Sequence, residues 1–382
     1  MTFTKIDIKK IFLLACAYLI LAISNSNAQV GFSFSTDQEY NDNPFHSPIP
    51  SESIISSANI GSELDIDAFA VGYYGSYFAF SNFRERNFYW HQLAAWKKFE
   101  NSTLGLYAEQ RINGTDYSYF DYTNLNAFYR ININTGGLFI VLTPYLNYTK
   151  YSNISILNNY KATFSYFINR GFESGTTFIL GGAFNFKKYT DPQQNGSFSY
   201  LDENNQLITE LYNDQNISSL SQLVTYGRTA QSITPTTGLA VQYTNKSILN
   251  GFAAQVKELN AVYGDESEIF DDPVNSEGNS VAVELTQILF DDMTVKAGFY
   301  LNYKKYPSQG LYDIDGNYNT EIMRSDDQKI FGLSISKSFE LDSESGMGLN
   351  LGLNYHFIKN NSNSYWFNYE NNSYNISLGL EF

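Results

Sequence analysis

Three histidines are the side chains of this sequence best suited to acid–base catalysis, and they lie in different settings. His46 lies in a proline-rich loop, His91 lies within a predicted strand, and His356 precedes the asparagine-rich segment 360–363. Hydrolytic sites need a histidine beside a serine or a carboxylate. His356 with that segment is the best enzymatic candidate, but an ordinary hydrogen-bonded histidine is the favoured interpretation. We therefore assign no catalytic residue and expect no enzyme.

Two acidic segments could supply oxygen ligands for Ca²⁺. The first is the cluster Asp265, Glu266, Glu268, Asp271 and Asp272, and the second is Asp313-x-Asp315-Gly316-Asn317-x-Asn319. Neither segment has a complete ligand set with a terminal glutamate. A solvated acidic loop and a glycine-containing turn are therefore the favoured interpretations, and no metal or other cofactor is expected.

Eight charged residues stand at alternate positions of segments whose remaining positions are apolar. Such charges could oppose one another across a pore and set its selectivity. Alternatively, they could pair between neighbouring strands and fill the interior, because a lone charge in a narrow space is costly. Both alternatives stay open. The residues are Glu109, Arg111, Arg130, Lys161, Arg228, Glu284, Lys296 and Lys304.

The last segment of the chain shows most clearly which elements must position these charges. Apolar residues stand at every second position from Tyr374 to Phe382, and serine, asparagine, glycine or glutamate stands between them. The segments 346–359, 325–340 and 293–305 repeat the pattern. A period of two places apolar side chains on one face of a β-strand and polar side chains on the other.

The alternation predicts sixteen strands, joined in turn by tight connections and longer ones. Short turns on one side and long loops on the other are typical of outer-membrane barrels, and an even strand number places both ends on the short-turn, periplasmic side. Fourteen and eighteen strands are the alternatives. The longer loops are 41–52, 113–120, 190–218, 248–276, 306–324 and 360–370. The strands are expected near 29–40, 53–66, 68–81, 87–99, 103–112, 121–132, 138–151, 157–169, 174–189, 219–232, 236–247, 277–290, 293–305, 325–340, 346–359 and 371–382.

Composition favours a membrane barrel over a soluble sandwich. Aromatic residues make up 17% of the chain and charged residues only 16%. A barrel uses aromatic side chains on its lipid-facing surface and at both membrane interfaces. The polar faces carry glycine, serine and asparagine rather than a mixture of lysine and glutamate, as expected in a crowded lumen. We therefore predict an all-β, transmembrane, antiparallel up-and-down β-barrel.

Residues 1–28 are predicted to be a cleaved signal peptide. Lysines precede an apolar run from Ile11 to Ile23 that is too short to span a bilayer, and Ser26-Asn27-Ala28 supplies a small-x-small cleavage site. Residues 29–382 then form one barrel domain. A lipoprotein signal ending at Cys16 is the alternative. Because Cys16 is the only cysteine, the mature chain has neither a disulfide nor a thiol nucleophile.

The charge and the ending indicate the partners. A net charge of −15 argues against nucleic acid. We expect an integral protein of a Gram-negative outer membrane, in contact with its lipids and lipopolysaccharide. Tyr374, Leu380 and Phe382 share the apolar face of the last strand. A terminal phenylalanine after such alternation resembles the signal read by the barrel assembly machinery, and an ordinary closing strand is the alternative.

Over residues 29–382 the chain resembles bacterial outer-membrane β-barrels in general. Arg324-x-Asp326 and the loop Ser362-Asn363-x₅-Tyr369 also resemble the barrel of surface lipoprotein assembly modifiers. Residues 265–382 are similar to an uncharacterised barrel family that is often fused to tetratricopeptide repeats. The segments that carry this likeness are Asp271-Asp272-Pro273, Leu285-Thr286-Gln287, Tyr303-Lys304-Lys305-Tyr306, Asp313-Ile314-Asp315-Gly316, Arg324 with Asp326, and Asn361-Ser362-Asn363 followed by Tyr365 and Tyr369.

Three functions are compatible with this prediction. The first hypothesis is a porin-like passive channel for small polar solutes, because sixteen strands enclose a water-filled lumen unless the loops 190–218 and 248–276 fold into it. The second is a non-channel barrel that acts as a scaffold or export partner for a secreted protein or polysaccharide. The third is a lipid hydrolase at the outer rim. The sequence identifies neither the solute nor the exported partner.

Overall fold

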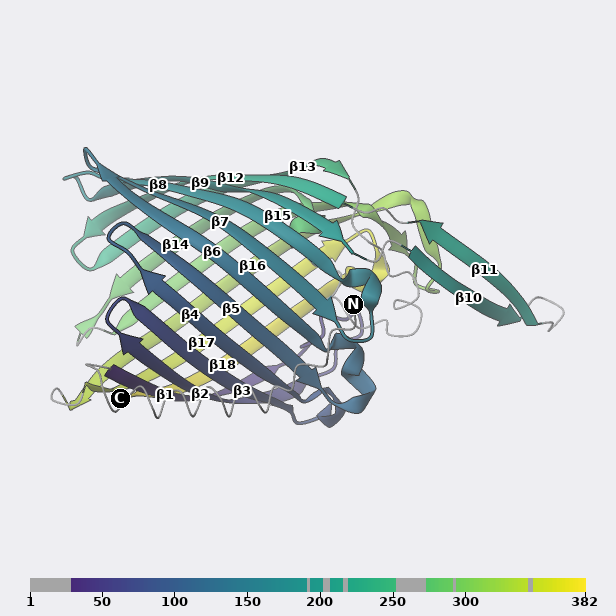
Figure 1. The fold of residues 1–382 in the computed structure, drawn as a ribbon, viewed down its shortest axis with the longest axis horizontal. Helices are drawn as coiled ribbons and strands as arrows, with labels where there is room; N and C mark the ends of the chain where they lie inside the picture. Colours follow the sequence, from purple (N-terminus) through teal and green to yellow (C-terminus); the bar gives the residue numbers. More distant parts are fainter. Residues whose placement is uncertain are drawn as a thin grey trace.

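The computed structural model describes residues 29–190, 193–201, 207–215, 219–251, 273–290, 293–342 and 346–382, with backbone pairing alone for 193–215. Sixteen strands form a closed antiparallel barrel (Figure 1). They are β1 (Gln29–Asn41), β2 (Ser53–Ile66), β3 (Phe69–Phe80), β4 (Phe88–Lys98), β5 (Ser102–Asn113), β6 (Tyr122–Thr135), β7 (Leu138–Tyr151), β8 (Asn159–Gly171), β9 (Thr176–Tyr189), β12 (Ser219–Thr234), β13 (Thr237–Gly251), β14 (Glu277–Ile288), β15 (Thr294–Tyr312), β16 (Tyr318–Asp342), β17 (Met347–Ser362) and β18 (Tyr369–Glu381).

The predicted fold class and the strand number of sixteen are confirmed. Strands adjacent in the chain pair with each other, β9 pairs with β12, and β1 closes the ring by pairing with β18. At that seam Phe32 and Phe382 exchange backbone hydrogen bonds of 2.8 and 3.0 Å. Closure leaves no wall strand with an unpaired edge, which is what a sheet needs where no water can satisfy its backbone.

Two predicted loops contain more strand than expected. Within 190–218, β10 (Gln193–Leu201) and β11 (Leu207–Gln215) pair only with each other, as a separate two-stranded sheet. Most of 306–324 is strand too, because β15 and β16 continue as a hairpin through a register shift near Gly310. Antiparallel pairing is local and needs no apolar face, so the alternation pattern could not reveal either extension.

We call the end of the barrel with tight connections the turn rim and the opposite end the loop rim. The turn between β6 and β7 is Gly136-Gly137, with φ values of 56° and 81°. Positive φ at both central residues is the geometry that joins twisted strands with two residues, and glycine adopts it without strain. Gln29 and Glu381, the outer ends of β1 and β18, both lie at the turn rim.

The loop rim carries short 3₁₀ helices and a small apolar cluster. The helices are η1 (Arg84–Arg86), η2 (Thr115–Phe120), η3 (Ser155–Leu157), η4 (Pro273–Asn275) and η6 (Tyr365–Phe367). Tyr119, Phe120, Ile154, Ile156 and Leu157 pack together there and join η2 to η3. In the segments that the structure describes, no helix is both long enough and apolar enough to cross a membrane.

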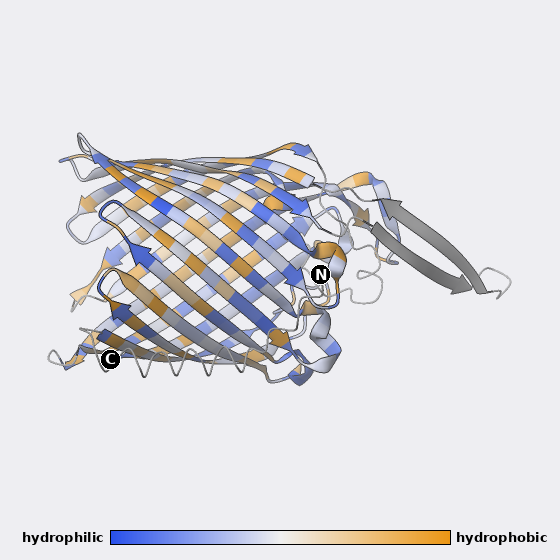
Figure 2. Cartoon of the chain, in the orientation of Figure 1, coloured by the Kyte–Doolittle hydropathy of each residue, from blue (hydrophilic) through white to orange (hydrophobic). Residues whose placement is uncertain are grey.

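The two faces of the wall differ in chemistry, as the alternating colours of Figure 2 show. Large apolar side chains such as Ile60, Leu106 and Ile376 remain 57–61% exposed on the outside of the closed ring. Exposed tyrosines such as Tyr89 and Tyr160 lie near the loop rim. A closed barrel with an apolar outer surface is the β-structure that lipid accepts, so the chain is built as an integral outer-membrane β-barrel.

Candidate functional site

The inner face of the barrel is the candidate functional surface, and strand register determines which side chains it carries. Because residues paired across strands point to the same side, the exposed apolar residues of each strand identify its outer positions. On β12, for example, Leu223 and Ile233 are outer residues, so Arg228 is an inner residue. The eight charged residues predicted above all occupy positions opposite to the outer apolar ones.

Arg228 and Glu284 form an ion pair across three strands of the wall. The Arg228 Nη2 to Glu284 Oε2 distance is 2.5 Å, and the Tyr300 hydroxyl donates to the other carboxylate oxygen at 2.9 Å. The strand between them, β13, contributes Ala240, which is in register with Glu284. Its small side chain leaves room for the two long ones to meet over it. The two opposite charges of this pair therefore compensate each other within the wall.

Glu109 and Arg111 have different partners. The Tyr107 hydroxyl donates to Glu109 at 2.6 Å, and the Asn124 amide donates to it at 3.1 Å. The Arg111 guanidinium lies 4.0 Å from the centre of the Phe88 ring and donates to Asn113 at 3.1 Å. The Glu109 carboxylate is thus hydrogen-bonded by neutral groups and keeps its negative field in the lumen.

The remaining predicted charges lie on three strands. Arg130 on β6 and Lys296 on β15 are exposed to the interior, whereas Lys161 on β8 and Lys304 on β15 are half-buried. Lys161, Lys296 and Lys304, together with Arg228, make most of the described charge on β8 to β15 positive.

Four inner carboxylates on β1 and β2 did not figure in the sequence prediction. Asp37 accepts hydrogen bonds from Ser57 at 2.8 Å and Asn59 at 3.2 Å, and Glu63 accepts one from Tyr74 at 3.2 Å. Glu39 and Asp65 occupy the same face. Their alternation with apolar residues could have identified them, since it is the signal that identified the other eight.

The ring order places this acidic wall opposite basic residues. Eight strand positions separate β1 from β9 and β2 from β12 in the sixteen-stranded ring, so these strands face each other across the lumen. β9 carries the buried Lys187, and β12 carries Arg228, whose charge Glu284 compensates. The acidic side chains bond to neutral donors rather than to these cations, so the carboxylates of β1 and β2 give their side of the lumen a negative field.

A ladder of amide and hydroxyl groups lines the inner face from β6 to β12. The Asn147 amide donates to Asn126 at 2.5 Å. Thr163 donates to Asn185 at 2.8 Å, and Asn185 donates to Gln222 at 3.0 Å. Such groups both donate and accept hydrogen bonds, so this part of the inner face resembles water in its bonding capacity.

The three histidines occupy unrelated places. His46 stacks on Tyr369 at the loop rim with ring centres 4.5 Å apart, and the His91 ring accepts or donates a 2.9 Å hydrogen bond with Tyr73 on the outer surface. The His356 ring lies over Gly332 on the inner face. The Asn360 amide donates to the Phe367 carbonyl, so it is engaged in holding η6 rather than directed towards His356.

The Asp313 segment folds as a turn, as the glycine-containing interpretation predicts. The Asp313 carboxylate accepts hydrogen bonds from the backbone N–H groups of Asp315 and Asn317, at 3.0 and 2.8 Å, and from the Asn317 amide at 2.8 Å. These donors, the Asn317 amide first, lower the pKa of Asp313. The acidic cluster 265–272 and most of the proposed plug loop 248–276 lie outside the described residues.

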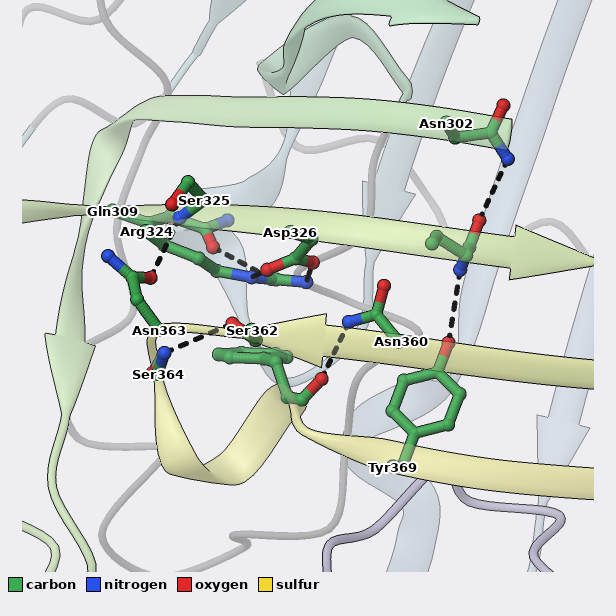
Figure 3. A network of polar contacts seen from close by, with 12 residues as sticks. Asn302, Gln309, Arg324, Ser325, Asp326, Asn360, Ser362, Asn363, Ser364 and Tyr369 are labelled. Atoms are coloured by element: carbon green, nitrogen blue, oxygen red, sulfur yellow. Dashed lines mark hydrogen bonds and ion pairs between the residues drawn. The ribbon is translucent and has the colours of Figure 1, made fainter. Parts of the chain in front are cut away.

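The residues of the Arg324-x-Asp326 and Ser362-to-Tyr369 motifs meet in one buried cluster at the loop rim (Figure 3). The Arg324 guanidinium pairs with Asp326 at 2.5 Å and lies between the rings of Tyr306 and Phe367, 4.0 and 3.4 Å from their centres. Asn363 accepts from the Ser325 N–H at 2.8 Å and donates to the Met323 carbonyl at 2.9 Å. The motifs thus hold the β15–β16 hairpin against η6.

Comparisons with known proteins give the following findings. No family model matches the chain, and no curated protein matches its sequence. Among solved structures, the fold is similar to OccAB1 of Acinetobacter baumannii, with 8% identity, a TM-score of 0.49, and coverage of 93% of this chain and 96% of that one. It is similar to opdK of Pseudomonas aeruginosa, with 8% identity, a TM-score of 0.48, and coverage of 93% and 98%. It is also similar to a loop-deletion mutant of OmpT, an outer membrane protein of Vibrio cholerae, with 11% identity, a TM-score of 0.45, and coverage of 93% and 99%.

Proposed function

We propose that this chain is a porin-like passive channel for small polar solutes. The observation that carries the proposal is the closed ring of sixteen strands, because barrels of sixteen or more strands leave an aqueous passage, whereas eight-stranded barrels are filled by side chains. We place the turn rim in the periplasm and the loop rim at the cell surface.

The chemistry of the inner face supports polar solutes. Amide and hydroxyl groups replace the hydrogen bonds that a solute loses to water, while acidic and basic walls on opposite sides interact with both ends of a dipolar molecule. Most inner positions of the described strands carry polar or small side chains, and inward-facing aromatic residues such as Phe88 and Trp90 lie beside Arg111.

Planar-bilayer recordings test the proposal. We expect purified protein to give stepwise conductance in lipid, and removal of the segments 190–218 and 248–276 to leave it unchanged or larger. A barrel that gives no steps, and is not opened by these deletions, is not a channel. Heat-denatured protein at the same detergent concentration is the control for leakage.

A second candidate function, a scaffold or export partner, rests on the hairpin of β10 and β11. These strands pair only with each other and add nothing to the wall, so they are available to contact another protein or a polysaccharide. The resemblance of residues 265–382 to repeat-fused barrels, and of two short motifs to surface lipoprotein assembly modifiers, also supports this second function. Deleting 193–215 should then stop surface display of an exported protein while single-channel conductance persists; unchanged display argues for the channel alone.

A further inference from the structure

A cavity of about 370 Å³ lies at the loop rim, where the first loop meets the ends of β17 and β18. Its polar lining includes Lys359, Asn361, Asn368 and Glu370. Lys359 and Glu370 occupy the outer positions of β17 and β18, on the face that carries the exposed Leu353 and Ile376 lower on the wall. The cavity therefore belongs to the outside of the barrel, at the level of lipid headgroups, and not to the lumen.

The walls of the cavity are held in place by buried hydrogen bonds. Asn43 is 1% exposed, and its amide donates to the carbonyls of Ser47 and Glu370, at 2.8 and 2.9 Å. Its side-chain oxygen accepts from the Ser47 N–H at 2.9 Å. The stacking of His46 on Tyr369 holds the same loop from the other side. A ligand would thus enter a site that is already formed, at little cost in ordering.

The groups that face the cavity match a neutral, hydroxyl-rich ligand. Lys359 and Glu370 form an ion pair, so their charges cancel and give no preference for an anion or a cation. The amides of Asn361 and Asn368 are exposed, and in the part of the chain that the structure describes they have no hydrogen-bond partner. Each amide offers both donors and an acceptor, as sugar hydroxyls require.

Two proline rings complete the match. Pro48 and Pro50 line the cavity and supply an apolar surface beside the polar groups. A pyranose has the same two-sided character, with hydroxyl groups around its edge and C–H groups on its faces. The volume lies at the lower end of the range of about 300–1,000 Å³ usual for small-molecule sites, which suits a short saccharide rather than a long chain.

We propose that this cavity binds a neutral saccharide unit, either the sugar of an outer-leaflet glycolipid or a free oligosaccharide. The site is independent of the channel, because none of the lining residues used here is a charged residue of the inner face.

Saturation-transfer NMR on purified, folded protein tests the proposal, with N-acetylglucosamine and maltotriose as soluble probes. We expect transfer to at least one sugar, and about thirtyfold weaker binding in the double variant Asn361→Ala, Asn368→Ala, since two amide hydrogen bonds of about 1 kcal/mol each are lost. Asn101→Ala, an exposed asparagine of the turn rim, is the matched control and should bind like the unaltered protein. Retention of the heat-modifiable gel shift shows that each variant is folded.

A second arm separates the two sources of the sugar. If lipopolysaccharide in nanodiscs competes with the soluble sugar, the site accepts a membrane glycolipid; if it does not, the site takes free sugar. Absence of binding by either sugar and by lipopolysaccharide overturns the proposal. It is equally overturned if the double variant binds as tightly as the control, or if inorganic phosphate displaces the sugars. None of these outcomes tests whether the barrel conducts ions, so failure of the sugar site and failure of the proposed channel are distinguishable.

Discussion

The electric field that a charged residue of the inner face contributes to the lumen depends on whether an opposite charge lies beside it. Arg228 and Glu284 compensate each other at 2.5 Å, whereas Asp37 and Glu63 accept hydrogen bonds from neutral donors of β2 and β3. A charge with a partner contributes little field at a distance, and a charge held by neutral groups contributes its full field. Selectivity should therefore change most when a pair is broken on one side only.

We expect Glu284→Gln to shift the zero-current potential in a KCl gradient towards anion selectivity, because Arg228 is then uncompensated. Arg228→Gln should shift it towards cation selectivity. The double variant should return close to the unaltered protein, since it removes both charges at once. A double variant that keeps the full shift of either single change would mean that the two residues act separately in the pore.

The buried pair Arg324–Asp326 should contribute to stability rather than to permeation. Both side chains are at most 3% exposed, so Asp326→Asn leaves a buried guanidinium without its carboxylate. We expect the free energy of unfolding to fall by about 3–5 kcal/mol, measured by denaturant titration in lipid vesicles. The matched control is Lys359→Gln in the exposed pair with Glu370, where the loss should not exceed about 1 kcal/mol. Equal losses in the two variants would contradict this reasoning.

At the scale of elements, strand positions follow from alternation, and strand ends do not. The predicted segment 53–66 coincides with β2, and 138–151 coincides with β7. The alternation predicts a strand that ends near residue 305, whereas β15 continues to Tyr312. Lipid imposes alternation only across its own thickness, so pairing beyond the membrane leaves no comparable pattern in the sequence.

Two glycines allow a comparison of backbone constraint within this wall. Gly278 has a φ of 142°, and a β-carbon built on it would lie 1.9 Å from the Tyr303 carbonyl oxygen, whereas one built on Gly227 would meet nothing within 4 Å. Gly278→Ala should lower the free energy of unfolding by at least about 1–3 kcal/mol and reduce refolding yield. Gly227→Ala should change the free energy by no more than about 0.5 kcal/mol. Similar effects at both positions would refute the backbone explanation.

At the scale of the whole molecule, two roles can be distinguished for Phe382, the last residue. Its backbone closes the ring between β1 and β18, and its side chain is a candidate assembly signal. The backbone of Phe382 bonds to Phe32 and closes the ring, while its side chain is 47% exposed. We propose that the exposed ring, with Tyr374 and Leu380, is read by the assembly machinery. Phe382→Ala keeps the backbone bonds, so it should refold normally into lipid but assemble poorly in cells.

The comparison variant for this experiment lacks Phe382 altogether. Its loss of both backbone hydrogen bonds should weaken closure in lipid as well as assembly in cells, measured by the heat-modifiable gel shift in each case. If Phe382→Ala assembles in cells as efficiently as the unaltered chain, the side chain is not a signal and the residue serves closure only.

Alternation along each strand is enough to identify the β-barrel class and to assign nearly every wall side chain to the inner or the outer face, because a period of two is a local property of the strand. It could not determine which strands face each other. That depends on the ring order, in which β12 follows β9 and β1 meets β18, so that Asp37 and Glu63 come to lie across the lumen from Lys187 and Arg228. The same holds for the pairing of Arg228 with Glu284 over Ala240 and for the cavity beside Lys359. Each joins residues far apart in the chain: the pairing of β12, β13 and β14 brings the ion pair together, and closure of the ring between β1 and β18 forms the cavity.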